Sequence, residues 1–580
     1  MPEPFTNQQI AERFELLADL LELEGAVVYR ILAYRRAAKT LRETPESVER
    51  LSLQGKLTSL SGIGQTIADK VAELIETGHI AALTKLEERN PPGAVAVMHI
   101  QGVGPKTARR IFTELDLKTV GDVRQAALEQ RVRALPGLGI KTETAILEGL
   151  ATSDAPVRRR STVARLLPLA ETIREQLSQS PAVERCEIAG SLRRFTESAK
   201  DIDIVAAVTN GVTAVEAFVS QDWVASVGSR GEAGATAVAH DGTRVELRVV
   251  APSAFGNLWQ HLTGSKDHNV ALRERAVRAK LKVSEYGIED TTSGEVFTTP
   301  DEADVYKRLG MEWIPPELRE NRGEIKAALE GKLPNLVELD QIRGDFHMHT
   351  DWTDGKASLE QMVNGAIELG RSYVCITDHS PSVGFGMGLD AGRLRAQIER
   401  VRALAEQLEP AFTLLVGCEV DILKDGTLDY SDELLAELDV VVASVHASHR
   451  LSKDAQTKRV VEAMRNPYVD ILGHPTGRRI GQRDPNPLDM EQIVQVAAET
   501  GTVLEVSGQP ERLDLSDVHV RLALDAGAKL AIDTDGHSLQ ALGYMKFGVM
   551  NARRGWAPPE AVVNTREWPE ARKLLKRGRE

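Results

Sequence analysis

From Asp345 onward, short apolar segments that are typical of β-strands alternate with helical segments about seven times. The strand-like segments are GDFHMH, YVCITDH, TLLVGCEVDI, VVVASVHAS, YVDILGH, TVLEVSG and KLAIDTDGH. Such alternation indicates parallel strands joined by crossover helices, and seven or eight of these units close most simply into a barrel. The pattern therefore predicts an α/β barrel whose chemistry lies at the carboxyl ends of its strands.

Side chains that bind metal ions gather at these predicted strand ends. They are His347, His349, Asp354, His379, Glu419, His446, His474, Asp535 and His537. A lone histidine is most often a core or surface residue, but mixtures of imidazole and carboxylate are typical of zinc, manganese or iron sites. We therefore predict a metal centre at one barrel mouth. His449 and His519 do not follow the pattern and are predicted to be surface residues.

The length of 580 residues is too great for one hydrophobic core and indicates several domains. Three scattered cysteines favour neither a disulfide framework nor a zinc knuckle, so we expect a cytoplasmic protein. No leader-like start or membrane-spanning apolar run is evident. The net charge of −14, taken alone, argues against nucleic acid, but it averages over domains and includes any metal-binding carboxylates.

The first 150 or so residues are rich in helix formers, and a short pattern returns three times within them. The copies lie at 60–71, 100–111 and 135–146, with the glycine pairs Gly62 and Gly64, Gly102 and Gly104, and Gly137 and Gly139. One Gly-x-Gly is most often a helix-cap turn. Three, each before a helix, indicate turns that present backbone N–H groups to phosphate. They resemble helix-hairpin-helix motifs, which implies DNA-backbone binding without base readout.

The segment GSLRRFTESAKDIDIV, residues 190–205, places two carboxylates before an apolar stretch. Asp201 and Asp203 share one face of a strand, where divalent ions would neutralise them. Glu246, in the strand-like segment TRVELRVV, is the candidate third acid. Ser191 and Arg194 could hold departing phosphates. A bare D-x-D is most often a solvated acidic turn, but the Gly-Ser opening and the spaced third acid favour a metal site.

This G-S-x-R-R and D-x-D combination resembles the nucleotidyltransferase signature of DNA polymerase family X. The segment HLTGSKDHNVALR, residues 261–273, resembles that family's thumb, which implies nucleotide contacts by Gly264, Asp267 and Asn269 and a template contact by Arg273. Residues 28–41 resemble the family's small phosphate-binding domain. Relatives with lyase activity have their Schiff-base lysine at the position of Lys70, although an unactivated lysine keeps its proton and an ordinary phosphate contact is the alternative.

Several positions depart from the family pattern. Glu246 replaces the usual aspartate, Ala199 and Lys200 replace small residues before the first acid, and His261 with Leu262 replaces an aromatic pair that screens the sugar. We expect weakened discrimination against ribonucleotides. The same changes are compatible with a slow polymerase.

The nine side chains of the predicted barrel resemble the ligand set of the PHP (polymerase and histidinol phosphatase) domain. The resemblance implies three ions, held by His347, His349, Glu419 and Asp535, by Glu419, His446 and His474, and by Asp354, His379 and His537. Such a centre hydrolyses phosphoesters. Arg450 and Arg478 are candidates for holding the substrate phosphate. Fusion to a polymerase favours DNA as substrate, for a 3′ exonuclease or an abasic-site (AP) endonuclease.

The predicted fold class is multidomain α+β and α/β, with helix-hairpin-helix regions, a palm and thumb like those of polymerase beta, and a distorted (β/α)7 barrel. The predicted domains are 1–80 (small DNA-end domain), 81–155 (fingers-like), 156–252 (palm), 253–328 (thumb), 329–342 (linker) and 343–575 (PHP).

The predicted function is gap-filling DNA polymerisation in repair with a 3′–5′ exonuclease, using Mg²⁺ or Mn²⁺ at the palm and up to three Mn²⁺ or Zn²⁺ ions in the PHP domain. The predicted partners are gapped or 3′-recessed duplex DNA, bound without sequence preference, and deoxynucleoside triphosphates. We expect a monomer near the nucleoid and no membrane partner. The alternatives are a DNA-end scaffold with a decayed polymerase site and a small-molecule phosphatase.

Overall fold

The structure is a computed structural model that describes residues 5–44, 46–60, 62–91, 93–100, 103–151, 160–383 and 388–579. The chain divides into two compact units, residues 1–159, 172–186 and 200–249 in one and residues 160–171, 187–199 and 250–580 in the other. No helix among the described residues is both long and apolar enough to cross a membrane.

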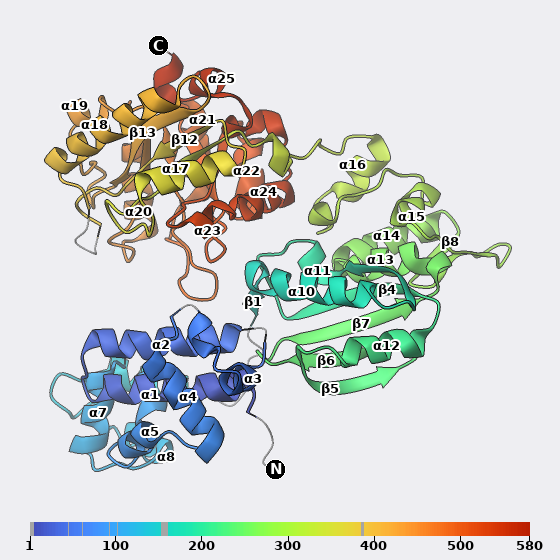
Figure 1. The fold of residues 1–580 in the computed structure, drawn as a ribbon. Helices are drawn as coiled ribbons and strands as arrows, with labels where there is room; N and C mark the ends of the chain where they lie inside the picture. Colours follow the sequence, from blue (N-terminus) through green and yellow to red (C-terminus); the bar gives the residue numbers. More distant parts are fainter. Residues whose placement is uncertain are drawn as a thin grey trace. The chain divides into compact units, whose positions relative to one another are not determined.

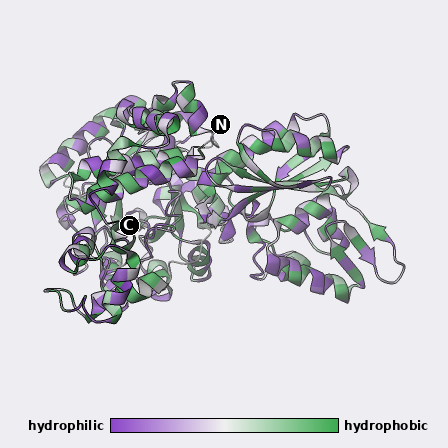
Figure 2. Cartoon of the chain, turned by 90° about the horizontal axis from the view of Figure 1, so that it is seen from below, coloured by the Kyte–Doolittle hydropathy of each residue, from purple (hydrophilic) through white to green (hydrophobic). Residues whose placement is uncertain are grey.

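The N-terminal region is helical, as predicted. Its helices are α1 (Asn7–Leu23), α2 (Val28–Glu43), α3 (Val48–Leu53), α4 (Gln65–Thr77), α5 (Ala81–Glu87), α6 (Ala94–Met98), α7 (Pro105–Glu114), α8 (Val120–Leu128) and α9 (Ile140–Ala151). They enclose two apolar cores, one around Phe14 and Leu41 and a second around Phe112 and Ile146. Figure 2 shows hydrophilic and hydrophobic residues mixed along the helices of the chain.

Each Gly-x-Gly copy precedes a helix, which confirms that part of the prediction. Gly64 and Gly104 are the residues immediately before α4 and α7, and α9 begins directly after Gly139. Gly62 has a φ of +81°, a conformation that glycine adopts without strain. Gly102 lies outside the described residues.

The predicted palm contains a five-stranded sheet in the order β2-β4-β7-β6-β5. Its strands are β2 (Val183–Ile188), β4 (Asp201–Val208), β5 (Val224–Gly231), β6 (Gly234–Ala239) and β7 (Arg244–Val250), accompanied by the helices α10 (Val163–Ser178), α11 (Gly190–Arg193) and α12 (Gly211–Val219). The short strands β1 (Ser161–Thr162) and β3 (Ser198–Ala199) pair separately.

The thumb is a mixed helical and antiparallel segment. Its elements are α13 (Phe255–Thr263), α14 (Lys266–Arg278), β8 (Leu281–Ser284), β9 (Gly287–Asp290), β10 (Val296–Phe297), α15 (Glu302–Arg308) and α16 (Glu324–Glu330).

A buried ionic cluster joins the thumb to α11. The Glu302 carboxylate accepts two hydrogen bonds from Arg319, at 2.6 and 2.9 Å, and two from Arg193, at 2.7 and 2.8 Å. The indole N–H of Trp313 donates to the same carboxylate at 2.8 Å. Burial opposes ionisation, but Arg319 and Arg193 together hold the pKa of Glu302 well below its usual range. The carboxylate thus ties the turn after the Gly-Ser motif to the end of the thumb.

The C-terminal domain is a seven-stranded parallel barrel, which confirms the predicted (β/α)7 fold (Figure 1). Its strands are β11 (Gly344–Met348), β12 (Tyr373–Ile376), β13 (Thr413–Asp421), β14 (Val440–Ser444), β15 (Ile471–Leu472), β16 (Val503–Ser507) and β17 (Leu530–Asp533). The first and last strands meet, because the His349 backbone N–H donates to the Gly536 carbonyl at 2.9 Å and that of Phe346 donates to Asp533 Oδ1 at 2.7 Å.

Helices surround the barrel, and side-chain caps fix where they begin. They include α17 (Leu359–Glu368), α18 (Ala391–Leu408), α19 (Asp432–Leu435), α20 (Lys453–Arg465), α21 (Met490–Thr500), α22 (Asp517–Asp525), α23 (Leu539–Leu542), α24 (Met545–Arg554) and α25 (Trp568–Arg572). Ser358, Asp390, Ser452, Asp489 and Ser516 each accept a hydrogen bond from the first turn of the following helix. Each of these helices therefore begins at a defined residue. The carboxyl ends of the strands lie at one mouth of the barrel.

Replacing Glu302 with alanine should destabilise the thumb by about 3–5 kcal/mol, because it leaves two buried guanidinium groups without their carboxylate. A chain of several domains does not unfold in one step. The measurement is therefore hydrogen exchange of the thumb peptides, which should lose protection in Glu302→Ala. Glu330→Ala, which removes an exposed carboxylate of the same segment, is the control and should leave exchange unchanged. Equal exchange in the two variants would contradict the prediction.

Candidate active sites

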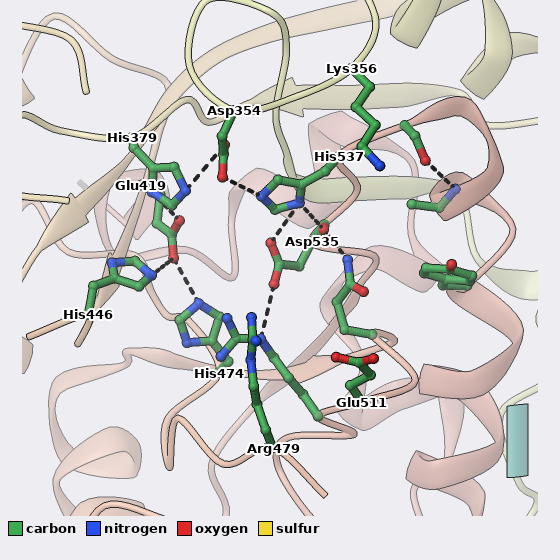
Figure 3. A pocket seen from close by; sticks show the side chains of 15 residues that line it. Asp354, Lys356, His379, Glu419, His446, His474, Arg479, Glu511, Asp535 and His537 are labelled. Atoms are coloured by element: carbon green, nitrogen blue, oxygen red, sulfur yellow. Dashed lines mark hydrogen bonds and ion pairs between the residues drawn. The ribbon is translucent and has the colours of Figure 1, made fainter. Parts of the chain in front are cut away.

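The barrel brings the nine predicted metal-binding side chains to one mouth (Figure 3). Each follows or ends a strand: His347 and His349 belong to β11 and its end, Glu419 lies in β13, and the others stand in the loops after their strands. Parallel strands place their carboxyl ends at the same rim, so positions far apart in the chain converge. That these side chains bind metal ions stays a prediction, which their shared position supports.

Glu419 lies at the centre of this cluster and is fully buried. Its Oε1 lies 2.9 Å from His474 Nε2 and 3.3 Å from His446 Nε2. Its Oε2 lies 2.9 Å from His379 Nδ1, 3.4 Å from His347 Nε2 and 3.6 Å from His349 Nε2. One carboxylate therefore faces five imidazole rings, the arrangement expected of a carboxylate shared between cations.

Three overlapping groups have ligand atoms within 4.8 Å of one another, and all groups of this kind among the described residues lie in this domain. They are His349, Asp354, His379 and His537; His347, His349 and Asp535; and His379, Glu419 and His446. The first contains the whole set predicted for the third ion, with His349 added. In the last, His379 joins Glu419 and His446, while His474 contacts Glu419 directly. Which side chain holds which ion stays a prediction.

The cluster fits metal ions. The Nε2 atoms of His347 and His349 and both Glu419 oxygens are buried and have no hydrogen-bond partner among the described residues. Buried polar atoms are normally satisfied, and a cation that accepted their lone pairs would supply the missing partner. Burial and the neighbouring His537 and His379 lower the pKa of His349 to about 3, and burial with Arg512 lowers that of His474 to about 4. Both rings are therefore neutral and able to ligate at neutral pH.

Two other histidines of the cluster, His379 and His446, have raised pKa values because acids surround their rings. Against the opposing effect of burial, Glu419 and Asp354 raise the pKa of His379 to about 10. Glu419 and Asp421 likewise raise the pKa of His446 to about 9. A protonated imidazolium therefore compensates the acids wherever no metal ion does.

A second layer of acids orients these rings, and the sequence reasoning missed it. Glu505 Oε1 lies 2.6 Å from His347 Nδ1, and Asp421 Oδ1 lies 3.2 Å from His446 Nδ1. Such partners set the tautomer and angle of a metal-binding histidine. The available signals were an acid inside the apolar strand TVLEVSG and a second acid two residues after Glu419.

The mouth opens into a cavity of about 340 Å³ that also carries basic and polar side chains. Lys356, Arg479 and Arg512 line it with Gln509 and Tyr544, and Arg512 Nε lies 3.6 Å from Asp535 Oδ2. In Figure 3, Lys356 and Arg479 approach the acids and imidazoles from opposite sides. These cations are placed to hold an anionic substrate beside the cluster.

The two arginines predicted to hold the substrate phosphate, Arg450 and Arg478, do not line this cavity. Arg478 donates to the carbonyls of Arg512 and Leu513 at 2.9 and 2.6 Å and pairs with Glu197 at 2.7 Å, so its guanidinium supports the loop, while Arg479 lines the cavity. Arg450 is exposed.

The two histidines predicted to be surface residues are half-buried. His449 contacts Asn486 at 2.8 Å and the His446 carbonyl at 3.0 Å, so it packs directly beside the cluster. His519 lies in α22, where burial lowers its pKa.

In the palm, the predicted acids lie on neighbouring strands. Asp201 and Asp203 in β4 are half-buried and alternate with the fully buried Ile202 and Ile204. Glu246 in the adjacent β7 is also half-buried, between the fully buried Val245 and Leu247. By this alternation the three acids belong to the outer face of the sheet rather than its core.

Two arginines that the sequence reasoning missed flank the third acid. Arg244 and Arg248 lie two residues to either side of Glu246 on the same strand face, 3.7 and 3.9 Å from its carboxylate. The alternating pattern R-V-E-L-R could have indicated them.

The predicted nucleotide-contacting residues of the thumb unit surround one turn. Gly264 has a φ of +68°, and a β-carbon there would lie 3.2 Å from Arg194 Nη1. Arg194 donates from Nη1 to the Thr263 carbonyl. Asn269 donates to the His261 carbonyl at 2.8 Å. The Thr-Gly-Ser turn and Arg194 therefore lie in contact.

The remaining predicted residues lie at the surface of their helices. Asp267 and Arg273 on α14 are exposed, Ser191 on α11 is half-buried, and Lys70 on α4 is half-buried. Their roles stay predictions, as does the weakened sugar discrimination expected from His261.

The fold and the two acidic sites define a nucleotidyltransferase-like protein that carries a PHP-type barrel. Family models match the helix-hairpin-helix domain at residues 5–80, a SAM-like helix-hairpin-helix tandem at 95–152, the DNA polymerase beta thumb at 258–320 and the PHP domain at 345–506.

Relatives match the whole chain or parts of it. "DNA polymerase/3′-5′ exonuclease PolX" of Bacillus subtilis is 36% identical over 573 residues, which are 98% of this chain and 99% of the relative. DNA polymerase lambda of Rattus norvegicus is 23% identical over 54% of this chain and 56% of its own. A "Probable phosphatase" of Thermoanaerobacter is 29% identical over 38% of this chain and 89% of its own. This chain belongs to the bacterial family X DNA polymerases with a C-terminal PHP domain.

Replacing Glu419 with glutamine should remove more bound metal than any single histidine substitution, because this carboxylate faces five imidazoles. The measurement is metal content by mass spectrometry after loading with Mn²⁺ and gel filtration. His519→Ala, on a helix outside the cluster, is the control and should keep the wild-type metal content. A Glu419→Gln variant with a full complement of metal would show that Glu419 is not a shared ligand.

Proposed function

We propose that this protein is a DNA polymerase that fills short gaps during repair and carries a metal-dependent 3′–5′ exonuclease on its PHP domain. The observation that carries the proposal is that one chain holds two separate acidic sites suited to phosphate chemistry, on the palm strands and at the barrel mouth. Alignment to the Bacillus subtilis polymerase and exonuclease along nearly its whole length supports the same reading.

For nucleotide addition, we propose that Asp201, Asp203 and Glu246 hold Mg²⁺ or Mn²⁺. Bound there, such ions would neutralise the reacting phosphate and favour ionisation of the attacking 3′-hydroxyl. The Ser191 hydroxyl and the Arg194 guanidinium would donate to the phosphates of the departing pyrophosphate. Gly264, Asp267 and Asn269 would contact the incoming deoxynucleotide, and Arg273 the template strand.

For DNA binding, the helix-hairpin-helix turns at Gly62–Gly64, Gly102–Gly104 and Gly137–Gly139 would donate backbone N–H groups to phosphates. Such contacts follow the backbone and do not read the bases, which suits gapped DNA of any sequence. We propose that Lys70 makes a phosphate contact and that the protein acts as a monomer in the cytoplasm, near the nucleoid.

For hydrolysis, we propose that the nine-residue cluster holds up to three Mn²⁺ or Zn²⁺ ions, which would supply an activated water. Lys356, Arg479 and Arg512 would hold the scissile phosphate beside it, since guanidinium groups bind phosphate oxygens in pairs. The probable phosphatases match only the barrel region, so they bear on the hydrolytic half alone. The neighbouring polymerase favours a DNA strand over a small phosphomonoester as the substrate.

The two-site proposal is tested by one variant in each site. Asp201→Ala should abolish nucleotide addition on end-labelled gapped DNA with Mn²⁺ and leave degradation intact, whereas His349→Ala should do the converse. One gel reports both activities. Loss of both activities in either variant would contradict two independent sites. Wild-type protein that degrades DNA without extending it would favour the DNA-end scaffold, and hydrolysis of a small phosphomonoester alone would favour the phosphatase.

Arg512→Ala should raise the KM for single-stranded DNA degradation roughly 10- to 150-fold, because removing one charged hydrogen bond to a phosphate is worth about 1.5–3 kcal/mol. Arg450→Ala is the matched control, since this exposed arginine does not line the cavity. The measurement is exonuclease kinetics against substrate concentration. An equal KM in both variants would remove Arg512 from substrate binding.

A further inference from the structure

One arginine of the barrel domain contacts the predicted nucleotide-binding arginine of the polymerase. Arg554, the last residue of α24, has a side chain that is only 7% exposed. Its Nη1 donates to the Arg194 carbonyl at 2.6 Å and to Glu320 Oε1 at 3.1 Å, and its Nη2 donates to Asp517 Oδ2 at 2.9 Å. The guanidinium group thus joins the turn after the Gly-Ser motif, the end of the thumb and the barrel.

Arg194 and Arg554 share one carboxylate oxygen. Arg194 Nε donates to the same Glu320 Oε1 at 3.1 Å, and its Nη1 donates to the Thr263 carbonyl beside Gly264. Phe195, the next residue, packs against Phe547 of α24 with ring centroids 5.9 Å apart. The barrel therefore contacts the Arg194 backbone and Phe195 directly, and it reaches the Arg194 side chain through the shared Glu320 carboxylate.

Because Arg194 and Arg554 share the Glu320 carboxylate, the carboxylate neutralises the Arg194 guanidinium only in part. A carboxylate held by a single arginine neutralises that arginine, whereas a carboxylate divided between two guanidinium groups leaves a net positive pair. Asp517 holds Arg554 in place and also pairs with Arg322 at 2.9 Å. Within the contacts described for them, these residues form a group of three arginines and two acids. Because Arg194, Glu320, Arg554 and Asp517 are at most 18% exposed, solvent screens these interactions weakly.

We infer that Arg554 is a positioning residue for nucleotide addition, through which the PHP domain holds Arg194 in place and keeps its guanidinium charge available to the phosphates of the incoming nucleotide. This inference rests on the proposed function, in which Arg194 binds those phosphates. Arg554 itself touches no reacting atom in this role. It links the hydrolytic domain to the nucleotide affinity of the polymerase and does not require the metal centre of the barrel to act.

A purely structural role is the competing explanation, and the chain offers a matched control for it. Arg553, the preceding residue on α24, also joins the barrel to the thumb, because it pairs with Glu317 at 2.8 Å and donates to the Val337 carbonyl at 3.1 Å. Its side chain is 11% exposed, close to the value for Arg554. It pairs with neither Arg194 nor Glu320 in the contacts described for it. Arg553→Ala therefore removes a comparable interdomain ion pair without touching the Arg194 group.

The experiment measures single-nucleotide addition to a gapped duplex by the full-length protein, with Mn²⁺ and increasing deoxynucleoside triphosphate. Arg554→Ala should raise the KM for the nucleotide about tenfold and change kcat by less than about twofold, the effect of losing one charged hydrogen-bond partner. Arg553→Ala should lower the hydrogen-exchange protection of α24 to a similar extent and leave this KM unchanged. Arg554→Lys should restore part of the affinity, because one ammonium can pair with Glu320 but cannot reach all three acceptors.

A Glu320→Gln background tests whether Arg554 acts on the nucleotide KM through the Glu320 carboxylate. Without the carboxylate charge there is nothing for Arg554 to share, so adding Arg554→Ala should raise the KM much less than it does in the wild type. An undiminished increase in that background, or equal increases in Arg553→Ala and Arg554→Ala, would overturn the inference.

Two further readouts separate this inference from its premises. Exonuclease activity measured in parallel should be unchanged in Arg554→Ala. If that activity is lost as well, Asp517→Asn is the deciding variant, because it removes the charge of the barrel partner of Arg554 at nearly constant volume. A raised nucleotide KM in Asp517→Asn supports the inference. An unchanged KM overturns it. Wild-type protein that adds no nucleotide would instead refute the proposed polymerase function, an outcome distinct from a polymerase whose KM ignores Arg554.

Discussion

The burial of one carboxylate among five imidazoles, at Glu419, is the interaction on which the barrel domain depends. A buried charge is tolerated only when opposite charges or a metal ion compensate it. Here the compensation comes from strand ends that are distant in the chain, so the barrel must close correctly before the site exists. Conversely, the histidines help to compensate the buried acids behind them, Glu505 and Asp421.

The polymerase half follows the same physical rule with different partners. Its three acids lie on the outer face of a sheet, where divalent ions and water can reach them, and Arg244 and Arg248 moderate the charge of Glu246. The thumb instead buries Glu302 between two arginines, in a network of five hydrogen bonds to its carboxylate. The half-buried acids of the palm are suited to binding ions, whereas the buried Glu302 is suited to holding the fold together.

Much of this could be read from residue order. The alternation of strands and helices predicted the barrel, the Gly-x-Gly turns predicted where α4, α7 and α9 begin, and the nine strand-end residues predicted the cluster. The choice of cavity arginines was harder. Arg478 and Arg479 are neighbours in sequence, yet only the fold decides that Arg478 supports the loop while Arg479 lines the cavity. Arg554 carries no motif at all, and only its contacts reveal it.

The sequence alone determined the elements, because strand and helix periodicity and capping residues act over a few neighbouring positions. It also determined which residue types stand at the strand ends. Tertiary structure alone decided which of those side chains share an oxygen, which ring is neutral and which is charged, and which arginine meets Glu320. Those outcomes depend on distances and burial between residues hundreds of positions apart, and electrostatic energies in an interior change steeply with both.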